Sequence, residues 1–196
     1  MKKAKRRSYR DRYFENWQAV KEPAHNRKGY RMVYHYVGSF RRYAPARPER
    51  TLQMVKREML LSMLIGAALY VPAMLSGTAF THCRIANGLG VLSVVAWLIG
   101  MYGLVRFTAD GEYMKAMTAD EVDQCIRIGW VAHAVLLVLS ALAGAVQLIS
   151  GGSGTAWDIP VILAVLGCAA CSLIIRNLFS ALLMTTHKNV DGKPIA

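Results

Sequence analysis

Acidic residues are missing from every long apolar stretch of this chain, which has only 12 of them against 24 lysines and arginines. The four stretches are 59–75, 88–107, 128–149 and 159–175, and none contains Asp or Glu. Each is close to the roughly 20 apolar residues that one helix needs to cross a bilayer. The absence of carboxylates from these stretches argues against a proton-coupled transporter.

Cysteine is also scarce, and the four cysteines are Cys83, Cys125, Cys168 and Cys171. They are too few and too scattered to form the disulfide scaffold of a small secreted domain. No motif in the 196 residues specifies a reaction. We therefore expect no cofactor and no bound metal, and a non-enzymatic protein is favoured over an enzyme.

The hydrophobic residues, 54% of the chain, are concentrated in the four stretches. This pattern predicts an all-α integral membrane protein in which four helices form a transmembrane bundle. Residues 1–50 form a basic N-terminal region, 51–187 a four-span membrane domain, and 188–196 a short tail.

The positive charge is concentrated before the first span, where residues 1–58 hold 17 lysines and arginines against five acids. Basic residues recur around 106–127 and in the tail, whereas 76–87 has only Arg84 and 150–158 has none. The positive-inside rule therefore predicts that both termini are cytoplasmic, in a plasma or bacterial inner membrane. A secretory signal is not expected, because the first apolar run begins only at Met59.

The N-terminal region is predicted to contain a short helix and one or two strands. Ser8 is a candidate cap for a helix through Val20 that carries aromatic and basic residues. This helix either lies among lipid headgroups or packs on a small fold of the N-terminal region itself, residues 1–50, which we call the arm. Residues 29–43 are rich in Val, Tyr and Phe and predict strands, and 44–50 is a linker with two prolines.

The arm is the predicted lipid-binding segment, because a dense positive charge lies beside aromatic side chains that favour the membrane interface. The residues are Lys2, Lys3, Lys5, Arg6, Arg7, Arg10, Arg12 and Trp17. Anionic lipid headgroups of the bilayer are the expected partner, with another membrane or cytoplasmic protein as an alternative. Nucleic acid is not expected, since no recognition motif accompanies the charge.

The connection between the second and third spans holds the chain's only acidic patch, from Asp110 to Asp123. It is either a solvated loop or the place where the basic arm docks. Thr118 and Glu121 have the spacing of a capping box, which predicts a helix running unbroken into the third span. Asp158 is expected to cap the fourth span.

Each span carries two small residues four positions apart, which permits close helix packing in lipid. The pairs are Ser62 and Gly66, Ala96 and Gly100, Ser140 and Gly144, and Ala164 and Cys168. Two ionisable residues also fall within or beside the spans, His133 and Arg176. Such groups are candidates for function, but Arg176 can reach the headgroups and His133 can hydrogen-bond within the bundle, so structural roles are favoured.

Cys168-Ala-Ala-Cys171 on a helix of a four-span bundle resembles the quinone-linked disulfide oxidoreductases of the vitamin K epoxide reductase type. That family also carries cysteines in its first extracytoplasmic loop, where this chain has one, Cys83, in place of a pair. The resemblance implies Cys168 and Cys171 as catalytic residues of a membrane thiol oxidoreductase. However, the motif lies ten residues beyond Asp158, which places it about 15 Å along the helix and deep in the bilayer. An exchange partner could not reach the thiols there. A packing role for the two cysteines is favoured.

The sequence therefore favours a small multi-pass membrane subunit or scaffold whose basic arm engages anionic lipid or a cytoplasmic partner. A thiol-disulfide oxidoreductase is the alternative, and a small transporter comes third.

Overall fold

Four long helices dominate the structure, a computed structural model that describes residues 16–25, 27, 29–151, 154–190 and 193–194. Contacts group the chain into two compact units. The helical unit comprises Ala44–Gly111 and Asp120–Leu183, and the strand unit comprises the described parts of Met1–Tyr43, Glu112–Ala119 and Met184–Ala196.

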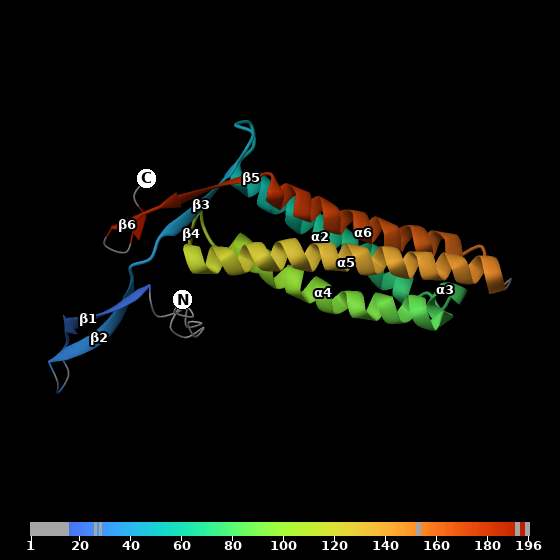
Figure 1. The fold of residues 1–196 in the computed structure, drawn as a ribbon, viewed down its shortest axis with the longest axis horizontal. Coiled ribbons are helices and arrows are strands. Elements are labelled where there is room, and N and C mark those ends of the chain that lie inside the picture. The colour runs from blue at the N-terminus through green and yellow to red at the C-terminus, as the bar shows by residue number, and fades with distance from the viewer. Residues whose placement is uncertain (1–15, 26, 28, 152–153, 191–192, 195–196) are drawn as a thin grey trace, which may run out of the picture. The chain divides into compact units, whose positions relative to one another are not determined.

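The helical unit is built from four long helices that run side by side (Figure 1). They are α2 (Leu52–Leu75), α4 (Arg84–Ala109), α5 (Ala116–Gly151) and α6 (Asp158–Ser180). Each is long and apolar enough to cross a membrane, as predicted. A short helix, α3 (Ala79–His82), lies between α2 and α4.

The long helices extend beyond the predicted spans. At the start of α2, the Thr51 side chain accepts a hydrogen bond from the Met54 N–H, and the helix begins seven residues before the predicted span 59–75. The prediction that a helix runs unbroken into the third span is confirmed by α5. That helix nevertheless begins at Ala116, so Thr118 lies within its first turn, and the expected capping box does not start it.

The helical unit has apolar side chains outside and small or polar ones inside. Leu64, Val95, Leu142 and Leu163 are each more than half exposed. In contrast, the buried polar residues Ser93, His133, Ser140, Asp158 and Ser172 are at most 2% exposed. This distribution is the reverse of a water-soluble bundle and is typical of helices that pack in lipid.

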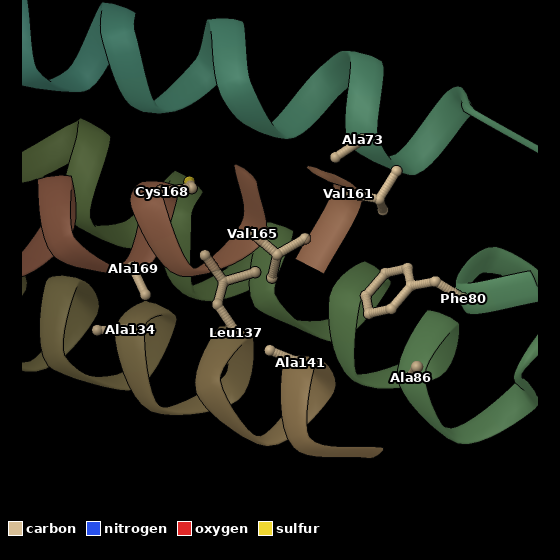
Figure 2. Close-up of a cluster of buried hydrophobic side chains, with 10 residues drawn as sticks. All are labelled: Ala73, Phe80, Ala86, Ala134, Leu137, Ala141, Val161, Val165, Cys168 and Ala169. Atoms are coloured by element: carbon tan, nitrogen blue, oxygen red, sulfur yellow. The ribbon is translucent and has the colours of Figure 1, made fainter. Parts of the chain in front are cut away.

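A cluster of buried apolar residues fills the interior of the bundle (Figure 2). Leu137 of α5 and Val165 of α6 are fully buried at its centre, and the fully buried ring of Phe80 extends into it from α3. Most other members are alanines, whose small side chains let the helix backbones approach closely.

The strand unit contains a hairpin in which β1 (Trp17–Pro23) pairs antiparallel with β2 (Tyr30–Tyr36). A second sheet has the order β4-β3-β5, from β4 (Tyr113–Lys115), β3 (Phe40–Pro45) and β5 (Leu182–His187). The short strands β6 (Asn189–Val190) and β7 (Lys193–Pro194) form a third pair. The expected strands within 29–43 are therefore confirmed.

The helix predicted over Ser8–Val20 is wrong for its last four residues, which lie in β1, while 8–15 are outside the described residues. Pairing across the hairpin explains the difference. The Trp17 ring meets Tyr36 edge-on at 5.5 Å between centroids. Arg31 Nη2 donates to Glu22 Oε2 at 2.9 Å, and this bond lowers the pKa of Glu22. Such cross-strand contacts outweigh the weak helical pattern.

Candidate functional site

Asp158 joins two connections at one end of the helical unit, the one between α2 and α4 and the one between α5 and α6. Its fully buried carboxylate accepts hydrogen bonds from the Phe80 N–H at 2.9 Å and from the Thr155 N–H at 2.7 Å. The Thr155 hydroxyl donates a third bond at 2.9 Å. The expectation that Asp158 caps α6 is therefore wrong, because Trp157 holds the cap position and the carboxylate is occupied elsewhere.

His133 of α5 is bonded to α6 in the interior of the bundle. Its Nδ1 lies 2.7 Å from the Ser172 hydroxyl oxygen, and that hydroxyl donates to the Cys168 carbonyl at 3.0 Å. The imidazole also meets the ring of Tyr70 edge-on, with 6.4 Å between centroids. A histidine bonded within the bundle is the structural role that the sequence favoured.

Other polar side chains in the bundle bond mainly to helix carbonyls. Tyr70 and Ser93 both donate to the Gly90 carbonyl at 2.6 Å, and Ser140 donates to the Ala86 carbonyl at the same distance. Among the described residues, one buried side-chain polar atom lacks a partner, the indole nitrogen of Trp130. The interior therefore meets nearly all of its hydrogen-bonding requirement.

A cavity of about 240 Å³ lies in the helical unit beside His133. Its walls are almost entirely apolar and come from all four long helices. The largest lining side chains are Tyr70 of α2 and Trp97 of α4.

A second cleft, of about 300 Å³, lies where α2 begins and α6 ends. Arg47 and Arg50 line it together with the apolar side chains of Val55, Leu178 and Leu182. Arg50 is paired with Glu58 at 3.1 Å, whereas Arg47 is exposed and makes no ion pair with any described residue. The cleft thus combines positive charge with apolar walls.

The predicted lipid-binding residues from Lys2 to Arg12 lie outside the described residues. Trp17 is described, and its ring is half-buried against Tyr36 in the strand unit. The Lys115 ammonium lies 4.4 Å from the centre of the Trp17 ring, a cation–π contact. Arg42 of the arm is paired with Glu112 of the middle connection.

Most of the small residues that the sequence proposed for packing lie at helix contacts. A side-chain carbon on Gly66 would lie 3.4 Å from Cys171, one on Gly100 would lie 3.0 Å from Trp130, and one on Gly144 would lie 2.2 Å from Phe80. Ala96, Ser140 and Cys168 are buried, whereas Ser62 and Ala164 are half-buried.

The cysteines are all free thiols. Cys168 is 2% exposed and belongs to the apolar cluster, while Cys171 is half-buried. Arg176 is exposed, and its guanidinium lies 3.4 Å from the Asn177 side-chain oxygen. Within the described residues, no cluster of His, Cys, Asp or Glu has the composition of a metal site.

The sequence reading missed Tyr70, Ser172 and the true role of Asp158. A signal for Asp158 was present, because it is the only acid between Asp123 and Asp191. Ser172 lies four residues after Cys168, so its hydroxyl can return to that carbonyl. Neither the isolated acid nor this spacing indicates which residues of the other helices lie opposite these side chains.

No protein family, curated protein or solved structure matches this chain.

Proposed function

We propose that this protein is a non-enzymatic membrane subunit or scaffold that crosses the bilayer four times and binds anionic phospholipid on its cytoplasmic side. The observation that carries the proposal is the cleft lined by Arg47 and Arg50. A phospholipid presents a phosphate next to apolar chains, and the cleft offers guanidinium groups next to Val55 and Leu178.

The charge on the helical unit supports a cytoplasmic position for this cleft. Lys56 and Arg57 of α2 and Arg176 of α6 lie within two turns of the cleft residues along the same helices. At the other end, the Asp158 carboxylate is buried and Arg84 is the one basic residue between 76 and 87. The positive-inside rule assigns the basic end to the cytoplasm, together with both termini.

The proposal includes the N-terminal arm as a second, diffuse contact with the same lipids. Seven basic residues between Lys2 and Arg12 precede Trp17 in the sequence. Each basic residue near an anionic leaflet contributes about 1 kcal/mol of attraction. The spans hold the arm beside lipid, so no separate encounter with a partner is required.

The lipid proposal predicts that exchanging Arg47 and Arg50 together for glutamine weakens anionic lipid binding about 30-fold. The estimate takes about 1 kcal/mol for each charge lost. The full chain is purified in mild detergent and titrated with short-chain phosphatidylglycerol and with phosphatidylcholine of the same chain length. The wild-type protein is expected to prefer phosphatidylglycerol and to lose this preference as salt rises, because salt screens exposed charges.

The matched control is Arg57→Gln, which removes an exposed charge of α2 that does not line the cleft. It is expected to change the affinity by less than threefold. If the two lipids bound equally well, or if Arg57→Gln weakened binding as much as the double variant, the cleft would not be a lipid site.

The structure favours packing over redox chemistry for the Cys168 thiol. Disulfide exchange requires a thiolate that an exchange partner can reach, and Cys168 is nearly inaccessible. A side-chain carbon on Gly66 would lie 3.6 Å from its sulfur, so the thiol fills the contact between α2 and α6.

A further inference from the structure

His133, which lines the cavity, has an unused hydrogen-bond acceptor. The Ser172 hydroxyl has one proton, which it donates to the Cys168 carbonyl. Its oxygen also lies 2.7 Å from His133 Nδ1, and both contacts are hydrogen bonds only when Nδ1 is the donor, so we assign the ring proton to Nδ1. In the neutral imidazole, Nδ1 then carries the proton and Nε2 carries a lone pair.

The lone pair on Nε2 has no hydrogen-bonding partner among the described residues, because the one bond of the His133 ring is made by Nδ1. His133 is 2% exposed and is one of the residues that line the cavity. No carboxylate among the described residues bonds to the ring, and an apolar interior accepts the neutral form more readily than the charged one. Nε2 is therefore an unpaired acceptor on a ring that lines an apolar space.

The cavity has the size and the walls of a site for a small ring-containing molecule. A cavity of about 150 Å³ lined by apolar side chains stays dry and binds benzene. This one is about 240 Å³, with Tyr70 and Trp97 as flat walls. Water needs two to four polar partners, whereas the walls here are almost entirely apolar.

The cavity is also accessible from the outer surface of the bundle. Val71 lines it and is 51% exposed, and Ala67 precedes Val71 by one helical turn on the same face of α2. The opposite wall is formed by Val94 and Trp97 of α4. A molecule dissolved among lipid chains can thus enter between α2 and α4.

We propose that this cavity binds a small apolar alcohol or phenol from the lipid phase, and that the ligand's hydroxyl donates a hydrogen bond to His133 Nε2. The apolar part fills the space between Tyr70 and Trp97. A ligand of the same size without a donor leaves Nε2 unpaired and binds more weakly. This site is independent of the lipid cleft, because none of its lining residues is shared.

The test compares 4-propylphenol with its methyl ether, 4-propylanisole, which lacks the hydroxyl proton. Each is titrated into the full-length protein, labelled with ¹⁵N at histidine, in detergent micelles. One hydrogen bond contributes about 0.5–1.5 kcal/mol, so the phenol is expected to bind up to about tenfold more tightly. It should also shift the Nε2 resonance of His133 in a saturable way, which the anisole should not do.

Two variants provide a matched pair. Ala67→Phe places a ring in the cavity and is expected to abolish saturable binding of both compounds. Ala68→Phe places the same ring on the exposed side of α2 and should leave binding unchanged. Equal affinities of phenol and anisole, or a non-saturable shift in the wild-type protein, would overturn the proposal without reference to any variant.

Discussion

Replacing Gly129 with alanine is expected to destabilise the bundle by about 2–3 kcal/mol, because α4 and α5 come into backbone contact at this residue. A side-chain carbon on Gly129 would lie 2.5 Å from the Gly100 nitrogen and 2.7 Å from its Cα. Backbone atoms cannot rotate away as a flexible side chain can. The helices must therefore separate, which also removes contacts of Trp130 with Gly100.

A change from glycine to alanine normally stabilises a helix, so a loss of stability at Gly129 would report the contact between α4 and α5. Alanine is favoured over glycine by up to about 1 kcal/mol in a helix interior. Gly88 of α4 serves as the control, since a carbon added there would meet nothing within 4 Å. Gly88→Ala is expected to be neutral or slightly stabilising. The free energy of unfolding is measured for both variants by titration with SDS in mixed micelles, and equal values would contradict the observed helix contact.

Replacing Asp158 with alanine is expected to cost about 2–4 kcal/mol of stability. The buried Phe80 N–H loses its acceptor, which costs about 1–3 kcal/mol, and the partly buried Thr155 N–H loses its acceptor at a smaller cost. Asp158→Asn should cost less, because one carbonyl oxygen remains to accept a bond. The same SDS titration measures all three proteins.

The control for Asp158 is Asp123→Ala, which breaks the Asp123–Arg127 pair on α5 at 2.8 Å. That pair is partly exposed, and pairs of this kind on a helix contribute about 0.3–0.5 kcal/mol. The variant should therefore be nearly as stable as the wild type. If Asp158→Ala were equally mild, the carboxylate would not hold the two connections together.

The four long apolar helices could be predicted from sequence because length and apolar content alone determine them, whereas features that depend on distant partners could not. Asp158 precedes an apolar run, which is a local signal for a cap, yet its carboxylate bonds to Phe80, which lies 78 residues earlier. Trp17 likewise sits in a segment with a weak helical pattern but pairs with Tyr36 across a hairpin.

The candidate site likewise depends on contacts between helices that a local sequence pattern does not predict. His133 was identifiable as an ionisable residue in an apolar stretch, but its bond to Ser172 depends on how α5 and α6 are rotated against each other. The cavity also depends on where α2 and α4 separate. The hydrophobic periodicity of a single helix cannot predict such a separation. The cleft at Arg47 and Arg50 was hidden in a segment whose two prolines mark it as a linker.

The most direct test of the four-span account is labelling of intact cells with a membrane-impermeant maleimide. Single cysteines are introduced in a background with Cys83→Ser and Cys125→Ser, and that background without an added cysteine gives the blank. His82→Cys and Trp157→Cys, both at exposed positions, are expected to react from outside. Gln124→Cys, also exposed, should react only after the cells are permeabilised. If Gln124→Cys reacted in intact cells while His82→Cys and Trp157→Cys were protected, the orientation would be contradicted. If all three variants reacted in intact cells, the membrane insertion itself would be contradicted.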